Sequence, residues 1–140
     1  MNALYTAEAL ATGDGRSGHS RTSDGRLDLD LAIPEAMGGS GDGTNPEQLF
    51  AAGYATCFHS ALQMVARADK ADITDSAVGA RVGSGPNDAG GFGLEVTLDV
   101  TLPNLGCGEA QSLVDKAHQV CPYSNATRGN IDVTISVTDD

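Results

Sequence analysis

The spacing of apolar residues along the chain predicts strands near its beginning and in its second half. Apolar residues alternate with Asp28, Asp30 and Ala32 over residues 27–33, the period-two pattern of a half-buried strand that Pro34 ends. Residues 4–11 predict an earlier strand, and the Gly-, Ser- and Asp-rich stretch that follows, to residue 25, predicts a loop or hairpin connection. Three later stretches also predict strands, the first two joined as a pair: residues 77–84, 92–102 and 131–137.

Two further segments have helical spacing. Thr44 or Asn45 can cap the first of them, Pro46 suits its first turn, and Glu47 favours its positive end. We expect this helix to reach about Ala68 and to be buried, because its middle is apolar almost all round. Residues 109–120 predict a second helix, which Pro122 disfavours from continuing. Strands, one long helix, strands, a second helix and a final strand together predict an α+β fold.

Length and composition narrow the class of protein. The 140 residues predict a single domain spanning 1–140, and no stretch approaches the ~18 consecutive apolar residues of a membrane helix. The net charge of −11, with two lysines, argues against nucleic acid and anionic membranes as partners. Three cysteines, an odd number, argue against a secreted disulfide framework, so we expect an unexported, cytoplasmic protein.

Cys57 and Cys121 are the candidate chemical groups. Cys57 lies inside the long apolar helix pattern, and Cys121 ends the second pattern, immediately before a proline. Two thiols on two buried helices of a cysteine-poor chain suggest redox chemistry, although composition alone favours small buried hydrophobic residues. Cys107 lies between two glycines in an expected turn and is interpreted as incidental and exposed.

A metal site is the main rival interpretation of these cysteines. Cys57, His59, His118 and Cys121 are residue types that bind zinc. Cys57 and His59 are two positions apart on a helix, however, and therefore point in roughly opposite directions. Neither histidine belongs to a zinc spacing motif, so we expect no metal and no other bound cofactor.

The segments around the two cysteines, Asn45–Phe58 and Val120–Ile131, carry a family resemblance. They resemble the organic hydroperoxide resistance family, in the superfamily that includes the osmotically inducible protein C. Four shorter segments resemble it in the same order: Ala11–Gly18, Ser23–Gly25, Met37–Gly39 and Gly90–Val96. The resemblance runs from about Leu4 to Val137. It implies an OsmC-like fold, with antiparallel sheets packed around a long buried central helix and a second helix, in an intertwined homodimer.

The resemblance also implies an activity and a set of site residues. It implies a thiol peroxidase that reduces alkyl, aryl and fatty-acid hydroperoxides, with Cys57 as the attacking thiol and Cys121 as the resolving thiol. Arg16 matches the position of the catalytic arginine that stabilises the thiolate, and Glu47 is the proposed carboxylate that orients it. The resulting disulfide is recycled by a dithiol, for which the family's donor is a lipoylated protein.

Helix geometry adds an expectation about how the site is assembled. Glu47 and Cys57 are ten residues apart, or ~15 Å along one continuous helix, so we do not expect them to meet by direct contact within that helix. Either Arg16 spans part of this gap, or the site combines two chains. We predict the second, with Cys57 of one subunit beside Arg16 and Glu47 of its partner.

The substrate pocket is expected to be apolar. Five residues are candidates for its walls as a group, although a core position is favoured for each taken alone: Leu49, Phe50, Tyr54, Phe58 and Phe92. Three alternatives stay open at this point: a related OsmC-type peroxidase with a different substrate preference, a redox sensor that uses the same disulfide, and a carrier module that uses the pocket without the thiols.

Overall fold

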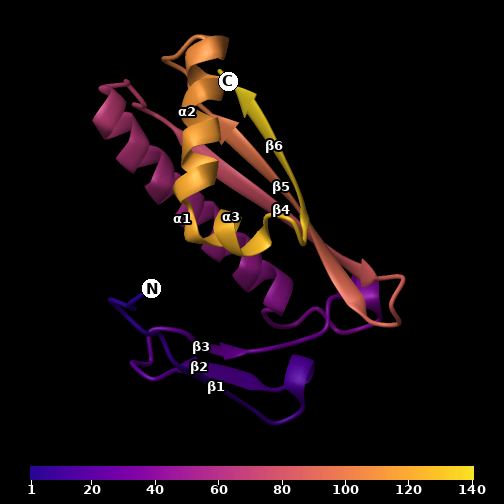
Figure 1. Ribbon diagram of the computed structural model, residues 1–140. Coiled ribbons are helices and arrows are strands. Elements are labelled where there is room, and N and C mark those ends of the chain that lie inside the picture. Colours follow the sequence, from indigo (N-terminus) through magenta and orange to yellow (C-terminus); the bar gives the residue numbers. More distant parts are fainter. The chain divides into compact units, whose positions relative to one another are not determined.

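The computed structural model describes residues 1–140, and the chain falls into two compact units, residues 1–49 and 50–140. The long helix α1 (Pro46–Asp69) begins in the first unit and continues into the second (Figure 1). Its bounds agree with the predicted helix, and Asn45 is its cap, since Asn45 Oδ1 accepts a hydrogen bond of 2.9 Å from the Gln48 amide.

The first unit is built on a three-stranded antiparallel sheet. The strands β1 (Ala9–Thr12), β2 (His19–Thr22) and β3 (Asp28–Asp30) lie in the order β1-β2-β3, and the 3-10 turn η1 (Gly15–Ser17) joins the first two. The predicted first strand is therefore confirmed only in its last residues. β2 lies where a loop or hairpin connection was expected, because its polar sequence lacks the alternation that marks a half-buried strand.

The strand predicted over residues 27–33 is also shorter than expected. Its regular pairing ends at Asp30, and Leu31 makes only an isolated parallel bridge to Thr44. A second 3-10 turn, η2 (Glu35–Met37), follows Pro34 before the chain reaches α1. The hydrophobic residue buried in this unit is Ala32, so packing contributes little to holding its strands.

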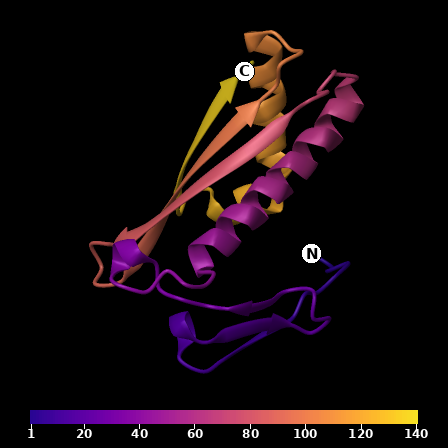
Figure 2. The same cartoon turned by 180° about the vertical axis from the view of Figure 1, so that it is seen from behind.

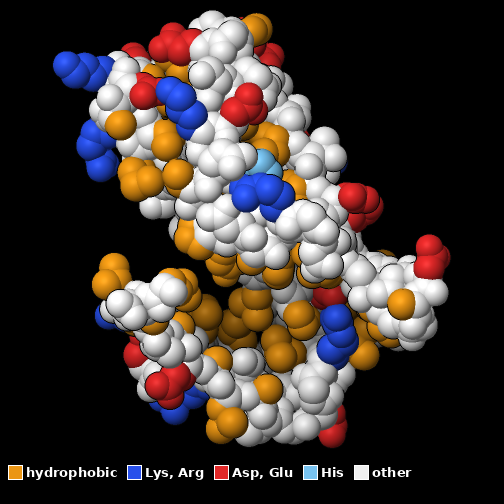
Figure 3. Space-filling model, viewed as in Figure 1, with side chains coloured by type: hydrophobic (Ala, Val, Ile, Leu, Met, Phe, Trp, Pro, Cys, Tyr) orange, Lys and Arg blue, Asp and Glu red, His pale blue; other side chains and the backbone are white.

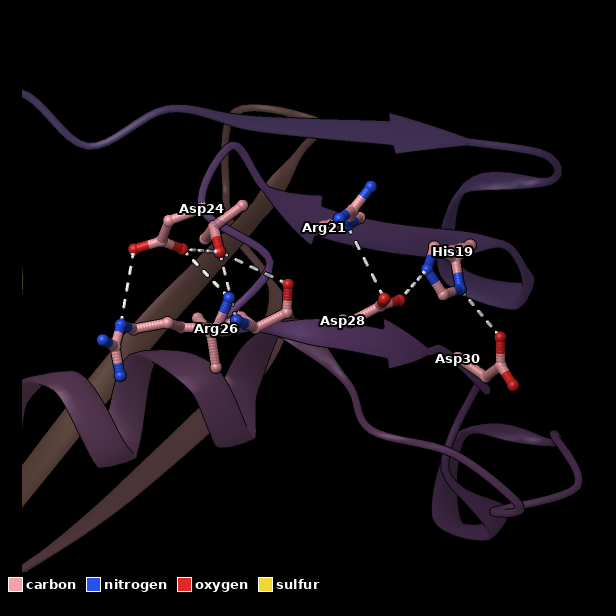
Figure 4. A network of polar contacts seen from close by, with 8 residues as sticks. His19, Arg21, Asp24, Arg26, Asp28 and Asp30 are labelled. Atoms are coloured by element: carbon pink, nitrogen blue, oxygen red, sulfur yellow. Dashed lines mark hydrogen bonds and ion pairs between the residues drawn. The ribbon is translucent and has the colours of Figure 1, made fainter.

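Charged side chains connect β2 to β3 in this unit (Figure 4). The imidazole of His19 lies between two carboxylates, with Nδ1 at 2.8 Å from Asp30 Oδ1 and Nε2 at 2.5 Å from Asp28 Oδ1. Arg21 Nε lies 3.6 Å from the other oxygen of Asp28. The hydrogen bonds from Asp30 and then Asp28 raise the pKa of His19. Cross-strand charge pairs thus join two strands that bury few apolar groups.

The second unit contains a sheet in the order β4-β5-β6, made of β4 (Ala77–Pro86), β5 (Phe92–Thr101) and β6 (Asp132–Thr138). These strands confirm the three later stretches of alternation. β4 and β5 are antiparallel, whereas β6 is parallel to β5. This sheet is therefore mixed, and the expectation that it is antiparallel throughout is wrong at β6. The reason is the connection: β6 follows α2 (Cys107–Val120) and α3 (Pro122–Thr127), and a helical crossover returns the chain in the same direction.

One core joins the helices to the sheet. The two long helices, α1 and α2, lie beside the sheet in the two opposite views (Figures 1 and 2). The core draws on α1, β5 and α2, chiefly through Tyr54, Phe58, Leu62, Val96, Leu98, Val100, Leu113, Val114 and Ala117. Alternate β5 side chains supply this core, which places both helices on the same face of the sheet.

α1 buries only one stripe in the single chain. Its buried residues are Tyr54, Phe58, Ala61, Leu62 and Ala66, at the spacing of one helix face. Apolar residues outside the stripe are accessible, and Met64 is 53% exposed. Burial all round, as the sequence predicts, is therefore not complete within one chain. The face shown in Figure 3 has exposed hydrophobic side chains, and its acidic side chains are scattered and do not form one patch.

Candidate functional site

Cys57 and Cys121 lie side by side in the second unit. Cys57 is on α1, and Cys121 is the extended residue between α2 and α3, with φ −66° and ψ 124°. The Cys121 thiol donates toward Cys57, and the two sulfur atoms are 3.6 Å apart. Cys121 is fully buried, whereas Cys57 is partly exposed. The sulfurs would have to approach by about 1.5 Å to form a disulfide of about 2.05 Å, so the pair is within reach of that bond.

Within the second unit, the surroundings of Cys57 do not activate its thiol. Burial is the largest influence and raises the pKa of Cys57, and the neighbouring Cys121 raises it further. The backbone N–H of Tyr123 hydrogen-bonds to the sulfur and opposes this shift, but the net direction is upward. None of these influences is a cation. Because the thiolate is the nucleophile, chemistry at Cys57 needs a positive charge in addition to them.

Hydroxyl groups fix the segment that carries Cys121. The Tyr54 hydroxyl lies 2.8 Å from Ser124 Oγ and 3.3 Å from Thr127 Oγ1. His118 Nδ1 lies 2.8 Å from the same Ser124 oxygen. Tyr54 and Ser124 are fully buried, and these hydrogen bonds tie α3 to both α1 and α2.

Three aromatic rings form a cluster next to the thiols. The ring centroids of Phe50, Tyr54 and Tyr123 are 5.6 to 6.2 Å apart in tilted and edge-on geometries. Gly53 makes room for one of them, since a Cβ there would lie 2.7 Å from the Tyr123 hydroxyl oxygen. Tyr123 is not among the predicted wall residues. The available signal was Gly53, a residue small enough for another chain segment to approach α1 closely.

The other predicted wall residues are not brought into this cluster. Phe58 is fully buried in the core, a placement that favours a packing role. Phe92 is 77% exposed at the beginning of β5, opposite Pro86 at the end of the hairpin. Leu49 is the last residue of the first unit and is partly buried. Phe50 and Tyr54 are thus the predicted wall residues that the cluster contains.

Arg16 and Glu47 are paired in the first unit. Arg16 Nη1 donates to Glu47 Oε2 at 3.0 Å, and Nη2 donates to Oε1 at 2.7 Å, which is bidentate geometry. The hydrogen bonds to Glu47 raise the pKa of Arg16, so its charge is permanent. Gly18 closes the loop that carries Arg16, because a Cβ there would lie 2.2 Å from the Thr12 carbonyl oxygen.

Each pair is complete within its own unit: Arg16 with Glu47 in residues 1–49, and Cys57 with Cys121 in residues 50–140. The pairing of Arg16 with Glu47 is therefore present in the structure. The prediction that these two residues act on Cys57 of a second subunit stays a prediction, as do the catalytic roles of all four.

The histidines of the rival metal site have other partners. His59 Nε2 lies 2.9 Å from Ser76 Oγ, and His118 bonds to Ser124. No group of three or more His, Cys, Asp or Glu side chains is arranged to hold a metal ion. Cys107 is exposed at the beginning of α2. None of the helices combines the length and apolar character that crossing a membrane requires.

Comparison with known proteins identifies the fold. The sequence model of the family described as "OsmC-like protein" matches residues 39–136. The crystal structure of an organic hydroperoxide resistance protein from Elizabethkingia anophelis superimposes with a TM-score of 0.95 at 50% identity, covering all of both chains. The fold is therefore that of the OsmC-like proteins.

Sequence relatives define the branch. The organic hydroperoxide resistance protein of Xanthomonas axonopodis pv. citri is 56% identical, over 96% of this chain and 94% of that protein. The organic hydroperoxide resistance protein OhrB of Bacillus subtilis is 48% identical, over 96% of this chain and 98% of that protein. The chain belongs to the organic hydroperoxide resistance family of OsmC-like proteins, and its relatives support a role in peroxide resistance.

Proposed function

We propose that this protein is a thiol peroxidase that reduces organic hydroperoxides to alcohols. The observation that carries the proposal is the approach of Cys57 and Cys121 to 3.6 Å in a chain of this family. One of these thiols is partly accessible and the other is buried against it, which suits an attacking and a resolving cysteine.

In the first step, the Cys57 thiolate attacks the distal oxygen of the hydroperoxide. The O–O bond breaks, Cys57 becomes a sulfenic acid, and the leaving alkoxide takes up a proton to become the alcohol. The sulfur is oxidised by two electrons and the peroxide is reduced by two. Since burial raises the pKa of Cys57, a cation has to stabilise its thiolate.

Arg16 is the proposed source of that charge. Its guanidinium is permanently charged and held by two hydrogen bonds to Glu47, which fix the direction in which its remaining N–H groups point. In the proposed assembly, Arg16 stabilises the thiolate and donates to a peroxide oxygen, while Glu47 positions Arg16 without touching the substrate.

Cys121 resolves the sulfenic acid. Its sulfur attacks Cys57, the S–O bond breaks, and the Cys121 proton leaves with the hydroxide as water. The disulfide protects Cys57 from irreversible overoxidation. An external dithiol then exchanges with the disulfide and becomes a disulfide itself, which returns both thiols to the protein. A dihydrolipoyl group on a lipoylated protein is the donor that we propose.

A homodimer is part of the proposal. Two features support it: the apolar positions of α1 that one chain leaves uncovered, and the exposed apolar residues near the N-terminus, including Leu4, Tyr5 and Leu10. A second copy would cover such surfaces. We also propose a cytoplasmic location, where a redox-active thiol pair stays reduced.

The aromatic cluster is the proposed wall of the substrate site. Phe50 and Tyr123 give an apolar surface beside Cys57, and the fully buried ring of Tyr54 packs behind them. Such a surface suits alkyl, aryl and fatty-acid chains more than hydrogen peroxide. Phe58 and Phe92 are not part of this surface, and Leu49 is retained as a candidate.

Turnover with a dithiol tests the proposal. The purified protein, supplied with dihydrolipoamide, should consume cumene hydroperoxide over many cycles, and Cys57→Ser should abolish this. Cys107→Ser is the matched control and should leave turnover intact. Oxidation of the thiols without turnover would favour a redox sensor, and unchanged function in Cys57→Ser would favour a carrier.

A further inference from the structure

His118 stands at one end of a hydrogen-bonded chain that the proposed reaction does not use. Its Nδ1 lies 2.8 Å from Ser124 Oγ, which lies 2.8 Å from the Tyr54 hydroxyl. That hydroxyl lies 3.3 Å from Thr127 Oγ1, and Thr127 in turn donates to the Ser124 carbonyl oxygen at 3.2 Å. Three members are buried, and no buried side-chain polar atom lacks a partner. Losing one member would therefore leave a buried group unsatisfied.

The chain joins the three elements that carry the thiols. His118 lies three residues before Cys121 on α2, and Tyr54 lies three residues before Cys57 on α1. Residues three apart on a helix share a face, so Tyr54 is attached beside Cys57, while His118 lies in the last turn of α2, directly before Cys121. Ser124, in the middle, belongs to α3, whose first residues include Tyr123, the donor of the backbone N–H to Cys57. These hydrogen bonds therefore help to set the position of Cys121 relative to Cys57.

The charge environment keeps the imidazole neutral. Burial lowers the pKa of His118, and the Arg128 guanidinium lowers it further, while Asp115 on the same helix acts in the opposite direction. Arg128 is held close, because its Nη2 donates to the His118 carbonyl oxygen at 2.6 Å. The other titratable groups beside this set of hydrogen bonds are the Tyr54 hydroxyl and the thiols of Cys57 and Cys121, which are uncharged when protonated.

We propose that neutral His118 is a positioning residue for the dithiol: through Ser124 and Tyr54 it holds the Cys121–Tyr123 turn where the Cys121 thiol can reach a Cys57 sulfenic acid. This inference rests on the proposed peroxidase function. It concerns the second step, in which the S–S bond forms, the S–O bond breaks, and the Cys121 proton leaves in water. His118 touches neither sulfur and exchanges no electrons, so its effect is on alignment.

Acid should weaken this alignment. An imidazolium at this position is partly buried and faces Arg128, so protonation favours movement of the ring toward solvent and away from Ser124. The condensation step should then slow as the pH falls through the lowered pKa of His118, which lies below the ordinary histidine value of about 6.5. An uncharged side chain that keeps the hydrogen bond should remove this dependence.

Two substitutions separate alignment from packing. His118→Asn places an amide near the position of Nδ1, where it can bond to Ser124 without titrating. His118→Phe keeps a ring of similar size and removes the bond. His59→Gln is the matched control, because His59 also bonds to a serine hydroxyl, that of Ser76, which is not part of the hydrogen bonds around Ser124.

The experiment follows the conversion of Cys57 sulfenic acid to disulfide by stopped flow after one equivalent of cumene hydroperoxide, between pH 5 and 8. At pH 7.5 we expect His118→Phe to be about five-fold slower, the factor for one ordinary hydrogen bond, and His118→Asn to be unchanged. Toward pH 5 the condensation rate of the wild type should fall relative to that of His118→Asn, while His59→Gln follows the wild type.

The outcomes distinguish this inference from the proposed function. A wild type that forms neither sulfenic acid nor disulfide overturns both. A wild type that forms the disulfide, with His118→Phe equally fast and no acid difference from His118→Asn, overturns the role of His118 alone. If His118→Phe does not fold, Ser124→Ala replaces it: a condensation rate equal to the wild type contradicts the inference, and a slower one supports it.

Discussion

Arg16 and Glu47 face each other across 31 positions of sequence, joined by two hydrogen bonds of 3.0 and 2.7 Å. The side chain of Glu47 is 14% exposed, so the pair is partly shielded from water, and such bidentate contacts are stronger than ordinary surface ion pairs. The pair fixes the direction of a positive charge, and the groups of the second unit that shift the pKa of Cys57 include no such charge.

The first prediction concerns the carboxylate of this pair. Glu47→Gln removes its charge and one of its two acceptor oxygens, so Arg16 is held less firmly. The reaction of Cys57 with cumene hydroperoxide should slow about ten-fold, the factor for one hydrogen bond to a charged group. Asp99→Asn is the control, since Asp99 also makes a bidentate pair, through Nε and Nη2 of Arg81, at an exposed position. Equal rates for both variants would contradict the role of Glu47.

The second prediction tests how the site is assembled. A heterodimer of one Cys57→Ser subunit and one Arg16→Ala subunit, purified through two different tags, should recover about half of the wild-type activity, because one of its two symmetric sites is intact. Each variant as a homodimer should be inactive. If the heterodimer is inactive as well, then Arg16 and Cys57 of the same chain form the site and the two-chain assembly is wrong.

The third prediction concerns the seat of Tyr123. In Gly53→Ala the new Cβ would lie 2.7 Å from the Tyr123 hydroxyl oxygen, so the ring has to move. Overpacking of this kind lowers the free energy of unfolding by about 1–3 kcal/mol. Gly108→Ala, on the open side of α2 with nothing near its Cβ, should instead stabilise slightly. Urea unfolding measures both, and two equally stable variants would show that Tyr123 does not depend on Gly53.

The fourth prediction follows from the charge of His19. The pKa of His19 is raised by Asp30 and Asp28, so the folded protein binds this proton more tightly than the unfolded chain. The stabilisation is present below the ordinary pKa of about 6.5 and is lost as the pH rises through the raised pKa. His19→Gln should thus lower the melting temperature at pH 5.5 more than at pH 8.5, in low salt. A difference that is the same at both pH values would contradict the pairing.

The sequence predicts the elements whose apolar pattern is strong. α1, β4, β5, α2 and β6 bury regular apolar faces, and the periodicity of these faces can be read directly from the order of their residues. β2 is not predicted, because its residues are polar and its pairing is made by backbone hydrogen bonds and by charged groups such as His19. α3 is not predicted, because its six residues are too few to show a helical period. The parallel direction of β6 is not predicted either, because it depends on a crossover connection that no local pattern encodes.

Some residues of the candidate site can be predicted from the sequence, and others cannot. The thiols and the Arg16–Glu47 pair are predictable, because reactive residue types in long specific segments are recognisable in one sequence. Tyr123 and the His118–Ser124–Tyr54 chain are not, since each depends on how α3 packs against α1 and α2. Phe92 shows the opposite failure: an aromatic residue in a plausible place is exposed at a hairpin end.

The central claim is that Cys57 and Cys121 are a redox pair. Peptide mass mapping of the reduced protein, before and after one equivalent of cumene hydroperoxide, tests it most directly. The structure leads us to expect rapid formation of a Cys57–Cys121 disulfide, with Cys107 still a free thiol. Three unchanged thiols, or a disulfide that involves Cys107 in place of either, would contradict the claim.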